Sequence, residues 1–320
     1  MTQYDIMLSM PPGWVDICQQ ENNVFYSAEW LNLLQDSFDT QTVYVWDKQN
    51  MMGFAISVFR AGPFRIGYAG FPVGGGLNGF DFTCETIEAL QHCKQSLKID
   101  LLKIPSSNFH SNTDLPLPSE KTYESAIEGL EDWKLSQISS SLKRNIKDAR
   151  RMGVQIIDAS TPTHGLAIYD LYHKTLQRHG GSLRYSKLYF QNLVQLSCKQ
   201  DNIRCLLATV NQDIIGFLCL VLSENIAYYL HAGMDTDWSK HRPSQLLIHD
   251  AITWSQQESY KTFNFMSSPY NQYQLVKYKE RWGSSTKYHL TYTLSLNKVK
   301  GSLFNISRYS YDFISRYIIR

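Results

Sequence analysis

The stretch YQLVKYKERWG, from Tyr273 to Gly283, follows closely on an apolar run with the composition of a β-strand, Phe263 to Met266. Its aromatic and aliphatic residues predict a short helix that carries Lys279 and Arg281. A lysine held there can meet a negative charge that develops during a reaction, because a preorganised cation stabilises an oxyanion by several kcal/mol. Lysines after apolar runs are also common on solvated helix faces. The order of the surrounding elements is therefore needed to decide between these interpretations.

Upstream of this stretch, patterns typical of strands alternate with patterns typical of helices. The most regular helix pattern, Ser136 to Met152, has one apolar stripe and one basic face and ends at Gly153. Three strand-like runs joined by polar turn residues then predict an antiparallel meander. The other predicted elements of this half are helices Leu166 to His179, Tyr189 to Cys198 and Pro243 to Gln256, and strands Cys205 to Val210, Ile214 to Leu222, Ile226 to Ala232, Thr262 to Met266 and Lys287 to Leu294.

The first half of the sequence repeats this order of paired strands, helix and strand, without obvious residue identity. The repeat predicts an α+β fold built from two copies of one unit, residues 1–130 and 131–320. Ser27 is the expected N-cap of the first helix. The predicted elements are helices Ser27 to Phe38 and Thr83 to Leu97, and strands Thr42 to Trp46, Met52 to Phe59, Arg65 to Ala69, Ile99 to Ile104 and Tyr123 to Ile127.

The composition is typical of a globular protein with enough chain for two cores. The 320 residues are 43% hydrophobic and 19% charged, and the formal net charge is +2. This charge excludes the strong basic field of a dedicated nucleic-acid coat, so a polyanion would have to meet a local patch. The cysteines lack the spacing of a metal site, and no apolar run reaches membrane-spanning length. We therefore expect a cytoplasmic protein without a bound metal.

Six short strings stand out because of their order along the chain. They are FYSAEW at 25–30, GFPVGGG at 70–76, RNIKDARRMGV at 144–154, TLQRHG at 175–180, HAGMD at 231–235 and YKERWG at 278–283. Together they resemble the FemABX family of aminoacyltransferases and its relatives with a FemAB-like GNAT domain. The resemblance spans residues 25–290. It implies two tandem GNAT-like (acyl-CoA N-acyltransferase-like) domains, with mixed, mostly antiparallel sheets flanked by helices.

The resemblance also implies a chemistry. Family members transfer an aminoacyl unit from aminoacyl-tRNA to an amine of a cell-envelope precursor of peptidoglycan or glycan type. By motif, Lys279 matches the lysine that stabilises the oxyanion, and Tyr278 matches the aromatic residue beside it. Arg178, or alternatively Arg184, matches an arginine that contacts acceptor phosphates, a role that suits the guanidinium fork.

The acceptor side departs from the family pattern. The lysine expected about one helical turn after Trp30 is replaced by Leu34 and Gln35, so an acceptor diphosphate would be held differently or be absent. Trp30 itself remains a candidate substrate contact. Gly74, Gly75 and Gly76 would let an acceptor approach the backbone, although a structural turn explains them as well. The coiled-coil hairpin of longer members is also missing.

The donor side rests on two basic segments. The segment HRPSQLL lacks the glycine pair that brings backbone amides close to a pyrophosphate, although Ser244 beside Arg242 can still bind one phosphate. Lys143, Arg144 and Lys147 on the predicted helix 136–152 can follow a phosphate backbone, but a solvated helix face explains them too. The missing glycines favour aminoacyl-tRNA over acyl-CoA as the co-substrate, with no further cofactor.

Two other functions stay open: an acyl-CoA-dependent N-acyltransferase of polysaccharide or cell-surface biosynthesis, and a non-catalytic glycan-binding protein. His179, His231 and His241 are candidate bases, with Asp235 to orient one of them, but their spacing matches neither a triad nor a metal site. The tail 302–320 is amphipathic. It would either pack on the second domain or make peripheral contact with the inner face of a membrane.

Overall fold

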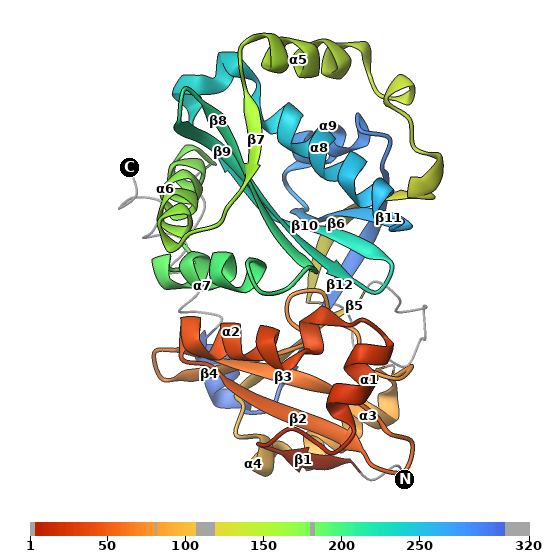
Figure 1. Cartoon of the computed structure of the whole chain (residues 1–320). Coiled ribbons are helices and arrows are strands. Elements are labelled where there is room, and N and C mark those ends of the chain that lie inside the picture. Colours follow the sequence, from red (N-terminus) through yellow and green to blue (C-terminus); the bar gives the residue numbers. More distant parts are fainter. Residues whose placement is uncertain (1–3, 81, 107–118, 180–182, 305–320) are drawn as a thin grey trace. The chain divides into compact units, whose positions relative to one another are not determined.

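The computed structural model describes residues 4–80, 82–106, 119–179 and 183–304 (Figure 1). The described chain divides into two compact units, residues 4–122 with 288–304 and residues 123–287. The boundary between the two units, after residue 122, lies a few residues before the predicted junction near residue 130. The end of the described chain belongs to the first unit, whereas the sequence scheme had placed it in the second.

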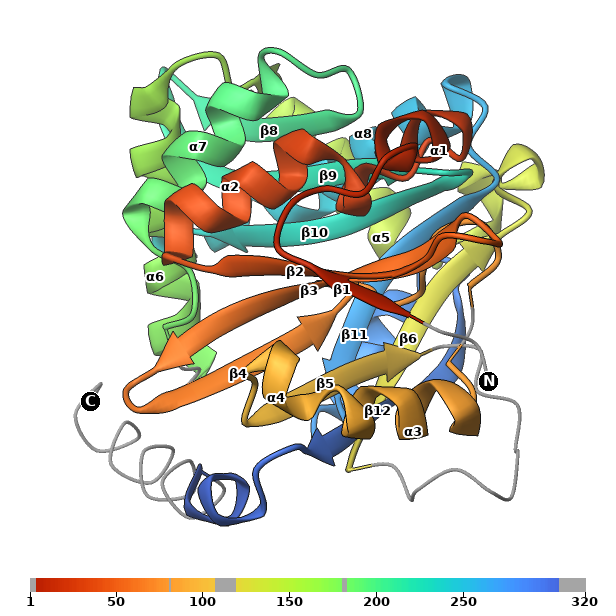
Figure 2. The ribbon, with the colours of Figure 1, turned by 90° about the horizontal axis from the view of Figure 1, so that it is seen from below.

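The first unit is built on a sheet with the strand order β1-β2-β3-β4-β5-β12. The β4–β5 pair is parallel, and the other pairs are antiparallel. Figure 2 shows α1 and α2 on one side of this sheet and α3 and α4 on the other. Residues 43–46 of β2 are all buried, as expected for a strand covered on both faces. The elements are β1 Asp5–Met7, α1 Trp14–Gln20, the 3-10 helix Val24–Tyr26, α2 Ala28–Phe38, β2 Gln41–Asp47, β3 Met52–Ala61, β4 Phe64–Ala69, α3 Cys84–His92, α4 Lys94–Leu97, β5 Leu101–Ser106 and β12 Ser285–Ser295.

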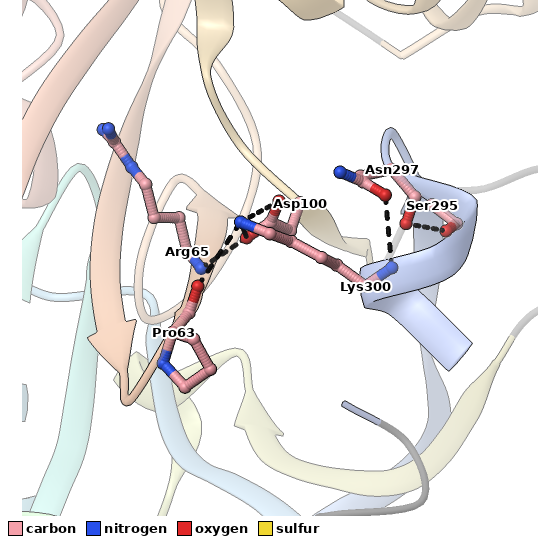
Figure 3. Close-up of polar contacts among 6 residues, drawn as sticks. All are labelled: Pro63, Arg65, Asp100, Ser295, Asn297 and Lys300. Carbon is pink, nitrogen blue, oxygen red and sulfur yellow. Dashed lines mark hydrogen bonds and ion pairs between the residues drawn. The ribbon is translucent and has the colours of Figure 1, made fainter. Parts of the chain in front are cut away.

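The chain returns to the first unit through β12 and the segment after it. Residues 290–295 of β12 pair with β5. Asp100, which is 7% exposed, accepts a hydrogen bond from the Arg65 backbone N–H at 2.9 Å. Its carboxylate also pairs with Lys300 Nζ at 3.4 Å (Figure 3). These contacts hold the returning segment on the sheet of the first unit.

The second unit has the strand order β6-β11-β10-β9-β8-β7. The strands β7 to β10 form an antiparallel meander, and β10 pairs with β11 in parallel. Helices α5 and α8 pack together, as do α6 and α7, and the residues of β9 from Ile215 onward are buried. The elements are β6 Glu120–Glu128, the 3-10 helices Leu130–Asp132 and Leu135–Gln137, α5 Ser140–Arg151, β7 Gln155–Asp158, α6 Pro162–His179, α7 Lys187–Ser197, β8 Ile203–Val210, β9 Asp213–Ser223, β10 Ile226–Met234, the 3-10 helix Thr236–His241, α8 Pro243–Gln257, β11 Thr262–Pro269 and α9 Tyr273–Glu280.

Most predicted elements are present, and the differences have local causes. Helix α5 begins four residues later than predicted, because Ser139 Oγ accepts the Leu142 N–H and caps the helix there. The predicted helix Thr83 to Leu97 is divided at Cys93, which ends α3 with non-helical dihedrals. In the described residues, no helix combines the length and the apolarity needed to cross a bilayer. The predicted amphipathic tail lies outside the described residues beyond residue 304.

Candidate functional site

Lys279 lies on α9 with its side chain turned into the second unit. The residue is 5% exposed. Its Nζ donates one hydrogen bond to the Met266 carbonyl oxygen at 2.8 Å and another to Ser268 Oγ at 2.7 Å, and both acceptors belong to β11. The amine is therefore held between a helix and a strand and does not extend into bulk solvent.

The Lys279 amine changes between its charged and neutral forms near neutral pH. Burial lowers the pKa of Lys279 from its ordinary 10.5 to about 7, and the nearby Glu124 carboxylate opposes this change. An ammonium has three N–H donors, and the two hydrogen bonds use two of them. The third position holds a proton in the charged form and a lone pair in the neutral form. The same amine can thus donate to an oxyanion or accept a proton, depending on pH.

The acceptors of Lys279 are fixed by a second set of contacts that the sequence analysis missed. Met266 has a left-handed backbone with φ of 58°, which is uncommon for a side chain of this kind. Its N–H donates to Asn264 Oδ1 at 2.7 Å, and Asn264 Nδ2 donates to Glu124 Oε1 at 2.7 Å. Asn264 is 7% exposed, so these bonds meet the need of a buried amide for partners. The one available signal was an asparagine inside the apolar run FNFM.

Tyr278 and Trp282, on either side of Lys279, are part of the apolar core. Tyr278 packs against the buried cluster of the second unit, and burial raises the pKa of its hydroxyl. Trp282 is fully buried, and its carbonyl accepts the Trp133 indole N–H at 2.9 Å. The Trp282 N–H donates to the Lys279 carbonyl at 2.9 Å. These contacts fix the end of α9 and with it the place of Lys279.

The two parallel strands beside Lys279, β10 and β11, pair with each other over only part of their length. The parallel ladder joins Ile226–Tyr228 of β10 to Thr262–Asn264 of β11. The pairing of β10 with β9 shifts register between Tyr229 and His231. Both strands continue past the ladder, and Met266 and Ser268 belong to this continuation of β11. Lys279 therefore bonds to the part of β11 that no longer pairs with β10. This part lies at the carboxyl ends of two parallel strands, where α/β sheets commonly bind ligands.

The predicted acceptor residues of the first unit have different environments. Trp30 has no exposed surface, and its indole N–H donates to the Phe71 carbonyl at 3.2 Å, so the prediction of a direct substrate contact is wrong. The bond instead ties α2 to the segment that leads into the glycine loop. Gly74 has φ of 86°, and a Cβ there would lie 2.2 Å from the Pro105 carbonyl oxygen. Gly75 has φ of 82° with open space around it, and its carbonyl accepts the Tyr26 hydroxyl at 2.6 Å. Gly76 follows in the same loop, where a Cβ would lie 2.6 Å from the Phe80 ring.

The predicted phosphate contacts are surface residues of the second unit. Arg178 lies near the end of α6 and Arg184 lies before α7, and both side chains are exposed. Arg242 is the exposed N-cap of α8 with φ of 57°, and it makes no side-chain cap. Ser244 Oγ donates to Met234 Sδ at 3.0 Å. The first turn of α8 thus combines a cation, a hydroxyl and the positive end of a helix dipole.

The basic face of α5 is linked to the helix that carries Lys279. Arg281, directly after α9, donates from Nη2 to Ser141 Oγ at 2.7 Å. Arg144 and Lys147 are exposed on α5, and Lys143 Nζ donates to the Ser136 carbonyl at 3.0 Å. The exposed positive charges predicted for donor binding therefore continue to the end of α9.

The histidines with described side chains do not form a catalytic triad. His231 is buried, its Nε2 lies 2.9 Å from the Tyr189 hydroxyl, and burial lowers its pKa to about 3. His241 packs against the Trp238 ring. Asp235 pairs with Lys174 at 2.5 Å, and no bond among the described side chains joins it to a histidine. Within the described residues, no group of three His, Cys, Asp or Glu side chains could hold a metal ion.

Comparisons with known proteins identify the kind of domain that contains this site. Residues 136–280 match the family model of the acetyltransferase (GNAT) domain. No curated protein sequence matches the chain significantly. Solved structures that share its fold include the following three. FemX has a TM-score of 0.62 at 12% identity, covering 93% of this chain and 99% of its own. L-PGS from Bacillus licheniformis has a TM-score of 0.59 at 12% identity, with coverage of 90% and 92%. The tandem GNAT protein from the clavulanic acid biosynthesis pathway has a TM-score of 0.56 at 8% identity, with coverage of 92% and 98%.

The structural matches confirm the predicted α+β fold with tandem GNAT-like units. The family-model match over residues 136–280 agrees with the predicted class of enzyme, an acyltransferase. The resemblance to FemABX proteins is confirmed at the level of the fold. The match to the family model includes Tyr278 and Lys279. Residues 136–280, less than half of the chain, are thus similar to the acetyltransferase (GNAT) domain, and the whole chain shares its fold with FemX.

Proposed function

We propose that this protein moves an aminoacyl unit from aminoacyl-tRNA onto an amine of a cell-envelope precursor, with Lys279 as the residue that stabilises the transition state. The observation that carries the proposal is the buried amine of Lys279, which two hydrogen bonds to β11 hold in one place. A hydrogen-bond donor that is already in place does not have to move when negative charge develops on the substrate. This preorganisation is the main source of its catalytic effect.

In the proposed step, the acceptor amine attacks the ester carbonyl of the aminoacyl-tRNA, and a C–N bond forms as the carbonyl oxygen becomes an oxyanion. The third N–H of the Lys279 ammonium donates to this oxyanion. Collapse of the intermediate breaks the ester C–O bond, and the ribose oxygen leaves with a proton that the attacking nitrogen loses. Orientation of the two substrates supplies much of the remaining rate.

The proposed donor site combines the first turn of α8 with the basic face of α5. Arg242 and Ser244 can bind one phosphate at the helix N-terminus, where Pro243 removes one backbone amide from the anion site. The exposed Arg144 and Lys147 can follow a nucleic-acid backbone toward α9. The proposed acceptor site uses Arg178 or Arg184 for phosphates.

The runner-up donor is acyl-CoA, and one observation favours it. The β10–β11 ladder stops at Tyr228 and Asn264 although both strands continue. Where two strands no longer bond to each other, backbone groups on their facing edges can bind an extended chain that carries amides, as the pantetheine arm of CoA does. In that case the acceptor would be an amine on a sugar or another small molecule.

The two donors are distinguished by incubating the purified protein with radiolabelled aminoacyl-tRNA or radiolabelled acyl-CoA, each with a deproteinised cell extract as the source of acceptor. We expect label to move from aminoacyl-tRNA to a component of the extract. Transfer from acyl-CoA alone would replace the first proposal with the second. If neither donor loses label beyond a control with heat-denatured protein, both transferase proposals are wrong and a non-catalytic glycan-binding role remains.

A further inference from the structure

The position of Lys279 depends on a chain of contacts that begins on another strand. Glu124 lies on β6 and accepts a hydrogen bond from Asn264 Nδ2 at 2.7 Å. The Oδ1 of the same amide accepts the Met266 N–H at 2.7 Å. The Met266 carbonyl in turn accepts from Lys279 Nζ at 2.8 Å. Three elements, β6, β11 and α9, are thus connected through one buried asparagine.

This arrangement constrains the backbone as well as the side chains. Asn264 donates with one end of its amide and accepts with the other, so its orientation is set by the two partners. The bond to the Met266 N–H supports a residue whose φ is 58°, a conformation that persists only where the surroundings hold it. The same conformation directs the Met266 carbonyl to the lysine.

We propose that Glu124 is a positioning residue that sets both the place and the charge of Lys279, acting through Asn264 on the backbone of Met266 and directly through its carboxylate. The contribution to catalysis rests on the proposed function, because it assumes that Lys279 meets the oxyanion. The effect on Lys279 itself does not depend on any activity.

Two opposing influences set the protonation of Lys279. Burial favours the neutral amine of Lys279, and Glu124 favours the ammonium. Glu124 also acts on the Tyr228 hydroxyl of β10 and on the Lys287 amine of β12. Lys287 forms its own ion pair at 2.7 Å with Glu128, which is on β6 as well. Glu128 therefore provides a matched carboxylate on the same strand that does not contact Asn264 in any described bond.

The first test measures the titration midpoint of Lys279 by NMR in protein with isotope-labelled lysine, assigning its signal from the Lys279→Met variant. Glu124→Gln removes the negative charge but keeps an oxygen that can accept from Asn264. We expect the midpoint to fall by about 0.5 to 1 pH unit in Glu124→Gln and to stay unchanged in the control Glu128→Gln. An equal midpoint in wild type and Glu124→Gln would overturn the charge part of the proposal.

The second test separates position from charge through hydrogen exchange of the Met266 amide. Glu124→Ala removes the acceptor of Asn264, so the Asn264–Met266 bond loses its support and the amide should exchange at least about tenfold faster. Glu124→Gln should retain most of the protection. Equal protection in wild type and Glu124→Ala would show that Glu124 does not position Met266. Neither measurement depends on transfer activity. If neither aminoacyl-tRNA nor acyl-CoA transferred label, the proposed function would be refuted, but this inference would still stand.

Discussion

At the scale of single residues, Lys279 makes the stability of the protein depend on pH. The native pKa of about 7 is below the 10.5 of the unfolded chain, so between these values the unfolded state binds more protons. The contribution of Lys279 to the free energy of unfolding should therefore rise from pH 7 to 10.5, by up to about 5 kcal/mol. Burial raises the pKa values of the Cys18 and Cys219 thiols, which act in the opposite direction above about pH 9, so the difference between wild type and Lys279→Met isolates the lysine. Chemical denaturation across this range measures the rise.

The variant Lys279→Met should lose this rise, whereas the exposed neighbour Lys277→Met should retain it. The slope with pH is the readout, because the variant also leaves the Met266 carbonyl and Ser268 without their donor. A rise of the same size in Lys279→Met and wild type would show that another group is responsible.

His231 should have an effect at acid pH. Burial lowers its pKa from 6.5 to about 3, so between these values the unfolded state binds the extra proton and stability falls as pH falls. His231→Gln removes this titration and can still bond to the Tyr189 hydroxyl. We expect its urea midpoint to depend less on pH between 6.5 and 4 than that of wild type. An unchanged dependence would contradict the neutral, buried state of His231.

The residues that could be predicted are those whose signal is local. Lys279 was found because a motif surrounds it, and Ser27 because a cap precedes an apolar pattern; its Oγ accepts the Trp30 N–H as expected. Asn264 and Glu124 are 140 positions apart, and nothing in either neighbourhood indicates the other. Trp30 was assigned to substrate on the motif alone, although a large aromatic residue on an apolar helix face is usually buried.

At the scale of elements, the N-cap of α5 supports the helix that carries the predicted donor surface. Ser139 Oγ accepts the Leu142 N–H, and its loss leaves a helix amide without that partner. Ser139→Ala should lower the free energy of unfolding by about 1 kcal/mol. Ser140→Ala, one position into the helix, should change it by less than half of this. Equal effects of the two substitutions in chemical denaturation would argue against the cap.

Element boundaries were less predictable than element types. The pattern of α5 was continued upstream to Ser136, because Ile138 fits its apolar stripe, whereas the observed helix begins after the Ser139 cap. The strand β7 was not predicted, since Gln155–Asp158 is short and pairs only with β8 among the described strands. Short edge strands carry little periodicity, and their pairing depends on a distant neighbour.

At the scale of the whole molecule, the returning segment ties the end of the described chain to the first unit. Asp100→Ala removes the acceptor of the Arg65 N–H and the partner of Lys300, and leaves a partly buried amide without this acceptor. We expect this change to destabilise the first unit by about 2 kcal/mol. Lys300→Ala breaks a partly exposed ion pair and a long hydrogen bond of 3.5 Å to the Pro63 carbonyl, and should cost less than about 1 kcal/mol.

Limited proteolysis with chemical denaturation of each variant measures both effects. Faster cleavage after β12 in Asp100→Ala than in Lys300→Ala would support the anchoring role of Asp100. Equal resistance of the two variants and wild type would contradict it.

The order of the elements made the tandem fold predictable, since each half repeats a pattern that periodicity reveals. The return of β12 to β5 was not predictable in this way. The contact between Lys300 and Asp100 joins residues 200 positions apart, and a sheet admits many strand orders with the same local patterns. A repeat in the sequence suggests two domains that follow one another along the chain. It does not indicate that a strand from the end of the chain, such as β12, pairs with a strand of the first unit.

Single-turnover kinetics, with whichever donor transfers label, measure whether the Lys279 amine stabilises the oxyanion of acyl transfer. We expect Lys279→Ala to lower the rate of the chemical step by about 100-fold or more, with little change in donor affinity, while Lys277→Ala on the exposed face of α9 stays near wild type. A rate within about twofold of wild type in Lys279→Ala, in protein that is shown to be folded, would contradict the claim.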